Sequence, residues 1–432
     1  MSLDSVSVDV LSYNEAAALV AKCAAKLARA RFSIESVKLE HAGGRVLARP
    51  LRADRDQPPF ARSTRDGFAC RATEGSTYVA LPISGSTRAG DAPSGSLVRH
   101  SAWEIMTGAP VPKGADAVVM LEHVEVADGR VRLLPPRTVE RGENIVAKGV
   151  QARKGDQLLP PGTVIGAAQI ALGAACGCAT LPVFRKPRVA ILATGDELVP
   201  VRSSPLPGKI RNSNAPMLSA MVAACGGVPW ILPTAADNAK ALDRALARSA
   251  DADLLLITGG VSAGKFDLVE PALARAGARF HFTGVRIQPG KPTVFGEIPR
   301  RRRTSPVQNQ NGTKYTKCYC MGLPGNPVSS AVTFQLFAAP ILNALRGSRE
   351  TYPRFALAKL ATSVKMKPGL TRFLPATCTF GAPISGSGPE VALVPWQGSG
   401  DIAAMSRANC FLVVPDNANP LQPGDIVRIL LT

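Results

Sequence analysis

Four segments of this 432-residue chain combine glycine with polar or charged residues, and each follows a short apolar run. They are 194–197 (TGDE), 258–264 (TGGVSAG), 289–292 (PGKP) and 322–327 (GLPGNP). Because glycine has no Cβ, its backbone N–H group can approach a phosphate closely, and a helix that begins nearby adds the positive end of its dipole. One such loop is most simply a turn. Four in one region predict a binding site for a phosphorylated ligand.

Acidic residues occur in the same region. Asp196 and Glu197 follow the first apolar run, Asp237 follows the second, and Asp267 begins the helix expected after the third. Carboxylates beside phosphate-binding amides would repel the ligand unless a divalent cation lay between them, and Mg²⁺ accepts a few carboxylates together with phosphate oxygens. The sequence therefore predicts a Mg²⁺ site at Glu197, Asp237 and Asp267, although Asp267 fits a helix N-cap equally well.

Lys291 is the cation of the third segment. It stands between Gly290 and Pro292, which both restrict the backbone, and its compact ammonium group suits an oxyanion. In the fourth segment, Asn326 fits a helix N-cap and Pro327 fits a first helical residue. We therefore expect an anion to lie near the start of that helix.

The elements that must position these loops alternate between strands and helices. The expected strands are 188–194, 228–234, 253–258 and 318–323, and the expected helices are 215–227, 238–250, 267–277 and 327–347. Such a βα repeat predicts an α/β domain with a mostly parallel sheet, here over 182–347, and ligands bind beyond the carboxyl ends of such strands. The polar stretch 301–317 is expected to be a solvated excursion between two strands.

The rest of the chain predicts three further domains. Ser12 and Glu15 form a capping box ahead of an Ala-rich helix. We expect a discontinuous helical N-terminal domain over 1–52 and 143–181, whose second helix could pack on the first. Short alternating runs predict an inserted β domain over 53–142 and a C-terminal β domain over 348–432. The fold class is thus multidomain α/β plus β.

Composition narrows the function classes. With 46% hydrophobic residues, no basic leader and no run of about 20 apolar residues, we expect a cytoplasmic protein without a membrane span. The nine cysteines are scattered and the histidines number four, so free thiols are expected and an imidazole metal site is not. The net charge of +19 favours anionic ligands, but aromatics make up only 5% of the chain, which argues against nucleic acid.

Seven ordered motifs carry a resemblance to a known family. They are RSTRDGFA, IMTGAPVPKGADAVVM, ATGDELV, IRNSN, TGGVSAGKFD, IQPGKPTVFG and MGLPGNPVSSAVTF. In order and spacing they resemble the molybdopterin molybdenumtransferases, the family that includes the C-terminal part of gephyrin. The resemblance implies an elongated four-domain homodimer, in which the α/β domain of one subunit meets the β domain of the other. It also implies the reaction: adenylylated molybdopterin and molybdate give molybdenum cofactor and AMP, aided by Mg²⁺.

The resemblance also implies roles for individual residues. The catalytic set is Asp66, Thr107, Asp237, Asp267 and Lys291, of which Asp66 and Thr107 would come from the partner subunit. The substrate and nucleotide set is Thr194, Gly195, Asp196, Glu197, Asn214, Gly259, Gly260, Val261, Ser262, Gly264, Gly325 and Asn326. The molybdate set is Lys291, Pro292, Ser329 and Ser399.

The chain departs from the family pattern at several positions. Gln288 stands where the family commonly has a lysine, and Leu370 stands where it usually has an arginine, so that the nearest arginine is Arg372. Ala61 replaces a frequent acidic residue, and Val150 with Gln151 replaces a Glu-Asp pair. The lost charges at Gln288 and Leu370 leave one alternative open, a scaffold paralogue that binds molybdopterin or nucleotide. The second alternative is an enzyme like molybdopterin adenylyltransferase on the same α/β domain, and the extra β domains and the RDGFA segment argue against it. Contacts with that adenylyltransferase or with acceptor molybdoenzymes are further expectations.

Overall fold

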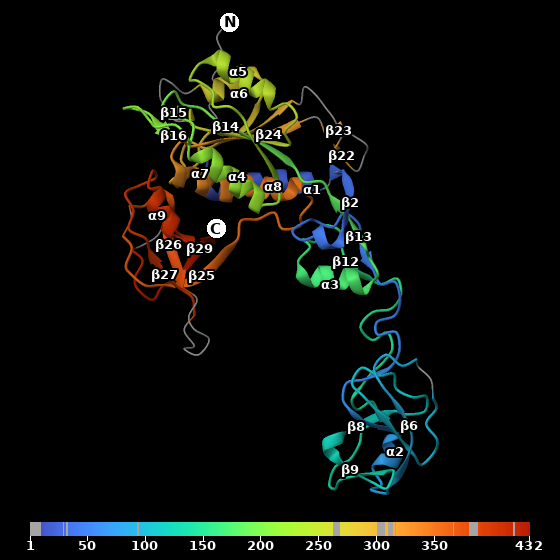
Figure 1. Cartoon of the computed structure of the whole chain (residues 1–432). Helices are drawn as coiled ribbons and strands as arrows, with labels where there is room; N and C mark the ends of the chain where they lie inside the picture. Colours follow the sequence, from blue (N-terminus) through green and yellow to red (C-terminus); the bar gives the residue numbers. More distant parts are fainter. Residues whose placement is uncertain are drawn as a thin grey trace.

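The computed structural model describes most of the chain and arranges it as an elongated molecule. The described residues are 10–28, 30–31, 33–92, 95–261, 268–299, 307–309, 314–315, 317–365, 367–379, 388–417 and 420–432. Figure 1 shows the α/β domain and the C-terminal β domain at one end, and the inserted β domain at the far end of a narrow connection. The expected combination of an α/β domain with β domains is confirmed.

The α/β domain is built on a six-stranded sheet. Its order is β17 (Val228–Ile231), β14 (Arg188–Ala193), β18 (Leu254–Thr258), β24 (Lys317–Leu323), β21 (Val294–Pro299) and β19 (Arg279–Phe282). The first four strands are mutually parallel, whereas β21 and β19 join antiparallel at one edge. The predicted parallel strands are therefore confirmed. Their runs are apolar throughout because helices cover both faces of the sheet.

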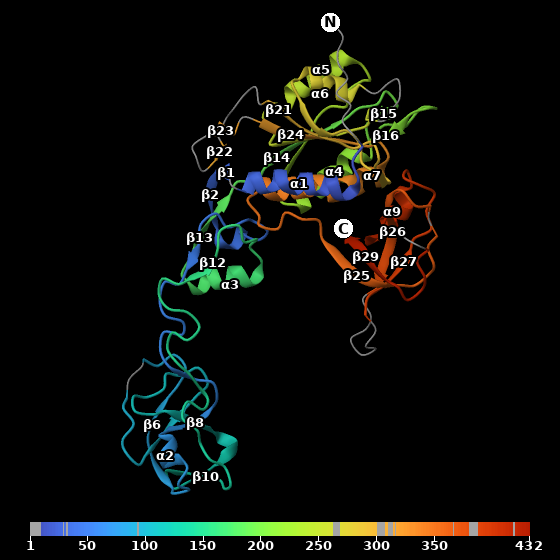
Figure 2. The same ribbon diagram turned by 180° about the vertical axis from the view of Figure 1, so that it is seen from behind.

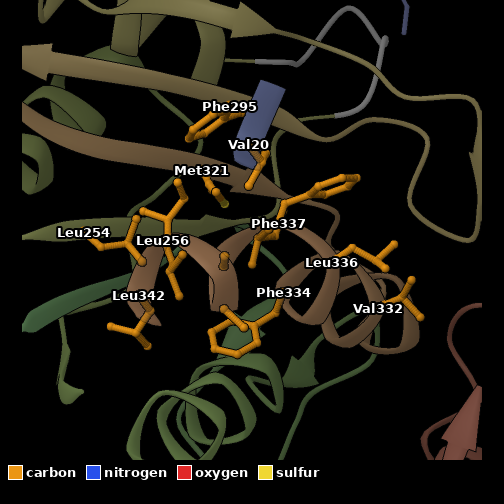
Figure 3. Close-up of a cluster of buried hydrophobic side chains, with 14 of the residues drawn as sticks. Val20, Leu254, Leu256, Phe295, Met321, Val332, Phe334, Leu336, Phe337 and Leu342 are labelled. Carbon is orange, nitrogen blue, oxygen red and sulfur yellow. The ribbon is translucent and has the colours of Figure 1, made fainter. Parts of the chain in front are cut away.

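Helices form the two outer layers. On one face lie α4 (Asn214–Ala224), α7 (Pro327–Thr333), α8 (Ala339–Leu345) and, behind them, α1 (Tyr13–Ala28); on the other lie α5 (Ala239–Arg248) and α6 (Val269–Arg275). Figure 3 shows the first layer, where Leu256 and Met321 of the sheet meet Phe334 and Phe337. The second layer packs around a separate apolar cluster.

The helical stretch Pro327–Leu345 is interrupted by a π turn over Phe334–Ala338. Pro340 has no N–H group to donate to the carbonyl four residues earlier, which lies within that turn. By length and hydropathy this stretch is the one helix among the described residues that could cross a bilayer. Because 89% of it is buried within the protein, it is a core helix of the domain.

The capping box before α1 is confirmed. The Ser12 N–H donates to the Glu15 carboxylate at 2.7 Å, and the Glu15 N–H donates to Ser12 Oγ at 3.3 Å.

The prediction that the second N-terminal helix packs on the first was wrong. Helix α1 packs on α8 and buries Val20 and Leu27 in the core of the α/β domain, because its small alanines allow close approach. Helix α3 (Ala167–Ala175) instead contacts a short turn at Leu39–His41.

Two passes of the chain connect the inserted β domain to the rest. Outgoing strands β2 (Ile34–Lys38), β3 (Leu51–Arg52) and β4 (Arg62–Ser63) pair antiparallel with returning strands β13 (Thr180–Phe184), β12 (Gln157–Leu159) and β11 (Ile145–Val146). The domain beyond them has a six-stranded sheet. Its order is β8 (Ala117–Met120), β5 (Gly67–Cys70), β7 (Ala102–Ile105), β6 (Leu81–Thr87), β10 (Arg130–Leu133) and β9 (Val124–Ala127).

The C-terminal domain is a closed ring of five strands. They are β26 (Thr371–Thr379), β27 (Glu390–Leu393), β25 (Phe355–Leu360), β29 (Ile426–Leu431) and β28 (Cys410–Val414), which pairs back onto β26. A short helix, α9 (Ile402–Arg407), precedes β28. One strand of the α/β domain, β20 (Ile287–Gln288), adds in parallel to β26 and joins the two domains.

The stretch 301–317, expected to be a solvated excursion between two strands, joins β21 to β24, and its described residues form short strands that the sequence did not predict. Strands β22 (Val307–Asn309) and β23 (Lys314–Tyr315) pair with each other, and β22 also pairs with β1 (Ala30–Arg31). Backbone hydrogen bonds need no apolar periodicity, so the polar sequence gave no signal for this pairing.

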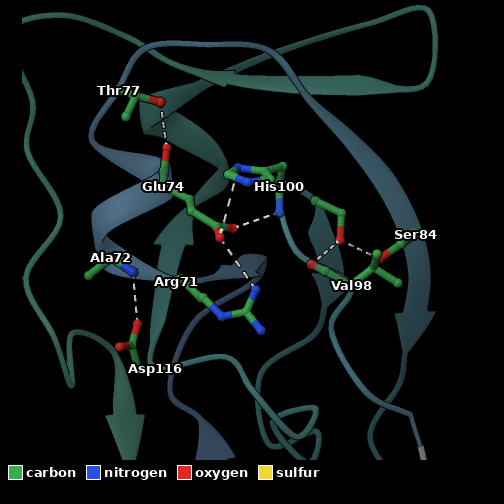
Figure 4. Close-up of polar contacts among 9 residues, drawn as sticks. Arg71, Ala72, Glu74, Thr77, Ser84, Val98, His100 and Asp116 are labelled. Atoms are coloured by element: carbon green, nitrogen blue, oxygen red, sulfur yellow. Dashed lines mark hydrogen bonds and ion pairs between the residues drawn. The ribbon is translucent and has the colours of Figure 1, made fainter.

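Polar contacts brace the inserted β domain at α2 (Ala72–Gly75). The Glu74 carboxylate is 14% exposed, forms an ion pair with Arg71 at 3.4 Å and accepts the His100 N–H at 2.9 Å. Asp116 accepts the Ala72 N–H at 2.8 Å (Figure 4). The carboxylates of Glu74 and Asp116 thus hold α2 to the loops that carry His100 and Asp116.

Replacing Glu74 with Ala should destabilise the inserted domain by roughly 1–3 kcal/mol, because the His100 N–H group and the Arg71 guanidinium would both lose a charged acceptor. Urea unfolding followed through Trp103 fluorescence would measure the change. Glu122→Ala, at an exposed acid of the same domain, is the matched control. Equal stability of the two variants would contradict this role for Glu74.

Candidate functional site

A pocket of about 750 Å³ lies at the carboxyl ends of the parallel strands. All four glycine-bearing segments contribute to its wall. The lining residues are Thr194, Gly195, Glu197, Leu198, Ile210, Arg211, Asn212, Ser213, Asn214, Asp237, Thr258, Gly259, Gly260, Val261, Pro292, Pro324, Gly325, Asn326, Pro327, Gly400 and Ile402. The structure therefore brings together eleven residues assigned from sequence to substrate, metal or oxyanion binding.

Glycine is required where the ends of β14 and β18 approach each other. Gly259 has a φ of +91°, and a Cβ there would lie 2.4 Å from the Thr194 carbonyl oxygen. Gly195 has a φ of +151°, and its Cβ would lie 2.6 Å from Glu197 Oε2. Both positions have a backbone conformation that L side chains rarely adopt, and at Gly259 the Thr194 backbone also leaves no space for a side chain. The two loops can therefore lie against the pocket with their backbones exposed to a ligand.

Asn214, the first residue of α4, links the loops. Its side-chain Nδ2 donates to Thr258 Oγ1 at 2.8 Å and to the Gly325 carbonyl at 2.6 Å. The residue is 8% exposed, and its Oδ1 is buried without a hydrogen-bond partner in the described structure. Because an unsatisfied buried acceptor carries a free-energy cost, Oδ1 is a candidate contact for a ligand N–H or O–H group.

The acidic residues divide into two groups. Asp237 accepts the Thr194 hydroxyl at 2.6 Å and the Asp196 N–H at 3.3 Å, and its own N–H donates to Asp196 Oδ1 at 3.1 Å. Asp237 and Glu197 both line the pocket, whereas Asp196 braces the Asp237 backbone and does not line it. Two carboxylates are therefore available to a ligand or cation.

A cation site is only partly built from the described residues. No three His, Cys, Asp or Glu side chains among them are grouped closely enough to hold a metal ion. Asp267, Ser262 and Gly264, which the sequence assigned to metal and nucleotide binding, lie outside the described residues. Glu197 and Asp237 nevertheless fit Mg²⁺, which takes one or two carboxylates and completes its shell with water and phosphate oxygens.

The residues assigned to the oxyanion are less closely grouped. Pro292 lines the pocket, and Lys291 beside it is exposed. Ser399 accepts a hydrogen bond from Asn326 Nδ2 at 2.7 Å, next to the start of α7. Ser329 is only 3% exposed and does not line the pocket. The structure therefore places Lys291, Pro292 and Ser399 on exposed loops around α7, and Ser329 in its core.

Asp66 and Thr107 lie in the inserted β domain, at the far end of the molecule from the pocket (Figure 1). The Thr107 N–H donates to the Asp66 carboxylate at 2.5 Å. Hydrogen bonds from the Thr107 backbone and side chain hold the pKa of Asp66 below its usual value, so it stays ionised. Within one chain these two residues do not reach the pocket.

Sequence reasoning missed two parts of the wall. The first is a projecting arm of β15 (Leu198–Val199) and β16 (Ile210–Arg211), which adds the exposed Arg211. The second is Gly400 and Ile402 from the C-terminal domain. Asp401 between them caps α9 by accepting the Ala404 N–H at 2.8 Å, and this cap in a glycine-rich turn was the available signal.

Comparison with known proteins identifies regions of one family in each part of the chain. Family models match residues 11–177 as the MoeA N-terminal region (domain I and II), 190–344 as a probable molybdopterin binding domain, and 357–432 as the MoeA C-terminal region (domain IV). A molybdopterin molybdenumtransferase of Staphylococcus aureus is 31% identical over 406 residues, which is 92% of this chain and 91% of that one. Another, from a Nostoc species, is 37% identical over 72% of this chain and 70% of its own.

A solved structure extends the likeness to the fold. A molybdopterin biosynthesis moeA protein from Pyrococcus horikoshii has a TM-score of 0.77 and 26% sequence identity, and the match covers 98% of this chain and 100% of that one.

Replacing Asn214 with Ala should weaken ligand binding roughly tenfold or more, because losing its hydrogen bonds uncouples the loops after β18 and β24. Equilibrium binding of AMP, followed by calorimetry, would measure the change. Asn343→Ala on α8, outside the pocket, is the control for a loss of the same side chain. Unchanged AMP affinity in the Asn214 variant would contradict this account of the site.

Proposed function

The chain belongs to the molybdopterin molybdenumtransferase family, and we propose that its pocket holds adenylylated molybdopterin beside molybdate. As a member of that family it is an enzyme of molybdenum cofactor biosynthesis. One observation carries the placement of the substrate: four glycine-bearing loops at one edge of a parallel sheet line a single pocket. Its volume of about 750 Å³ is in the usual range for a small-molecule site.

The nucleotide phosphates would lie against the glycine loops and the start of α4. Asn212, Ser213 and Asn214 bring that end of an 11-residue helix to the pocket wall, where its dipole is positive. Gly259 and Gly260 offer backbone atoms that no side chain screens. These features support binding of the phosphoanhydride in this part of the pocket.

Magnesium is part of the proposal. Glu197 and Asp237 would hold the ion, which supplies charge neutralisation at the phosphate oxygens and promotes release of AMP. The Thr194 hydroxyl and the Asp196 N–H each occupy one lone pair of Asp237, and so orient its carboxylate. Each Asp237 oxygen then retains a lone pair for the ion.

The molybdate would lie beside Lys291 and Pro292, where the ammonium group neutralises the oxyanion. The dithiolene sulfurs of the pterin would displace molybdate oxygen, which leaves as water with the thiol protons, so that the protein needs no nucleophile of its own. Placement of the two reactants in one pocket lowers the entropic part of the barrier. The work of the enzyme is therefore orientation and charge compensation.

The assembly we propose is a homodimer, because Asp66 and Thr107 contribute to catalysis only if a second copy brings its inserted domain to this pocket. The elongated shape in Figure 1 separates the inserted domain from the pocket within one chain.

We also propose a cytoplasmic location, since all nine cysteines are free thiols, which suits a reducing compartment. Of the functions left open by the sequence, scaffold and adenylyltransferase, neither is favoured by a feature of the pocket.

Replacing Glu197 with Gln should raise the Mg²⁺ concentration needed for half-maximal AMP release by roughly tenfold or more, since one of two proposed carboxylate ligands loses its charge. The assay combines the enzyme, adenylylated molybdopterin and molybdate over a Mg²⁺ titration. Glu390→Gln, at an exposed acid of the C-terminal domain, is the control. An unchanged Mg²⁺ requirement would remove Glu197 from the metal site.

Replacing Lys291 with Ala should raise the molybdate concentration needed for half-maximal cofactor formation by roughly tenfold to a hundredfold, as expected for loss of a charge-assisted hydrogen bond. The requirement for adenylylated molybdopterin should change much less. Lys365→Ala removes the same charge from an exposed position of the C-terminal domain and serves as control. Equal increases for both substrates would show that Lys291 serves the phosphates instead.

A further inference from the structure

The position of the inserted β domain depends on its connection to the rest of the chain. The connection consists of two passes without regular strands, 53–61 going out and 147–156 coming back. Regular pairing flanks it on both sides, at β3 with β12 and at β4 with β11. In Figure 1 the inserted domain lies well away from the other domains, beyond these passes. A small rotation in the connection therefore becomes a large displacement at the domain.

The returning pass turns at two glycines. Gly149 and Gly155 have φ angles of +71° and +90°. The Gly149 N–H donates to the Pro58 carbonyl at 2.9 Å, and the Gly155 N–H donates to the Ala53 carbonyl at 2.8 Å. These bonds join each turn to the outgoing pass. Because glycine has more backbone freedom than any other residue, the pass can still bend at both turns unless the segment between them is also held.

Asp56 of the outgoing pass holds that segment. Its Oδ1 accepts the Lys154 N–H at 3.0 Å, and its Oδ2 lies 3.5 Å from Lys148 Nζ. A Cβ added to Gly149 would lie 3.6 Å from Asp56 Cγ, so the carboxyl group also lies against the first turn. One side chain of the outgoing pass therefore contacts both ends of the segment 148–154 on the returning pass.

Of these contacts, the bond from the Lys154 N–H is the strongest. It is a charge-assisted bond to a backbone donor, whereas the Lys148 side chain is 60% exposed and an exposed ion pair contributes little. The same bond is the main reason that the pKa of Asp56 lies below its usual value, so the carboxylate stays ionised at neutral pH. The contact between the passes thus depends mainly on an acceptor oxygen at position 56.

We propose that Asp56 is a positioning residue, which holds the two passes in one arrangement and so sets where the inserted domain presents Asp66 and Thr107. The inference rests on the homodimer proposed above, in which those two residues reach the pocket of a second copy. The Thr107 N–H donates to the Asp66 carboxylate at 2.5 Å, so the domain presents both as one unit. The direction of the whole domain must then be set by the connection.

Replacing Asp56 with Ala should lower the rate of AMP release roughly tenfold to a hundredfold, because misplacing catalytic groups by about 1 Å can have an effect of that size. The affinity for AMP, measured by calorimetry, should not change, since the pocket that binds it is built by other domains. Asp56→Asn keeps an acceptor oxygen for the Lys154 N–H and should restore most of the rate.

Asp156→Ala is the matched control. The Asp156 carboxylate accepts the Arg153 N–H at 2.8 Å, and both residues belong to the returning pass. The control therefore removes the same kind of bond from the connection without separating the two passes, and it should leave AMP release unchanged. Equal losses of rate in the Asp156 and Asp56 variants would overturn the positioning role. An unfolding temperature of Asp56→Ala below that of the assay would make the residue structural and would also overturn it.

Mixed dimers test whether Asp56 acts on the pocket of the second copy. One subunit carries Asp56→Ala and an intact pocket. The other has an intact connection but lacks both proposed Mg²⁺ ligands, as Glu197→Gln with Asp237→Asn. The intact connection then serves the intact pocket, and AMP release should return to about half the rate of the unaltered dimer, since one of two equivalent pockets works. No recovery in mixtures that form dimers would overturn the inference.

The outcomes separate this inference from the proposed assembly. If sedimentation shows that the unaltered chain turns over as a monomer, the homodimer and the inference fall together. If the chain is a dimer and Asp56→Ala keeps its full rate, the inference falls and the homodimer stands.

Discussion

Two hydrogen bonds from the Asn214 amide hold the pocket together, because they join the start of α4 to the ends of β18 and β24. The parallel sheet brings those ends to one edge, but the loops beyond them could still diverge. Gly259 lets the neighbouring loop lie against the Thr194 carbonyl, so that β14 enters the same cluster. The backbone of the pocket is thus fixed from inside the protein, and its surface remains free for a ligand.

Charges of both signs occur at this pocket. The carboxylates of Glu197 and Asp237 come from the loops after β14 and β17. Arg211 comes from the β15–β16 arm that directly follows Glu197, and Lys291 stands next to the wall residue Pro292. These local charges, more than the net charge of +19, relate the electrostatics of the chain to its chemistry.

Local sequence patterns predicted the sheet, its helices and the four loops, because apolar runs, glycines and caps act over a few residues. Contacts between distant segments were not predictable in this way. The sequence of α1 predicts an apolar face, but it does not indicate that α8 is the helix on which this face packs. The pairing of β22 with β1 is made through backbone groups, which every residue has. The same limit applies at the site. Glu197 and Asp237 were found from their loops, whereas Asp196 turned out to support Asp237, and Ile402 was missed because it reaches the wall from another domain.

The doubled connection to the inserted domain has an evolutionary consequence. Arg62 and Val146 are register partners, so the points at which the chain enters and leaves that domain are neighbours. A domain inserted between two neighbouring points of a chain can be gained, exchanged or lost without changing the path of the rest of the chain. The part of this chain next to the insertion, at α3 and β13, has an apolar core of its own. The inserted β domain can therefore diverge at its own pace, while the rest of the chain keeps its architecture.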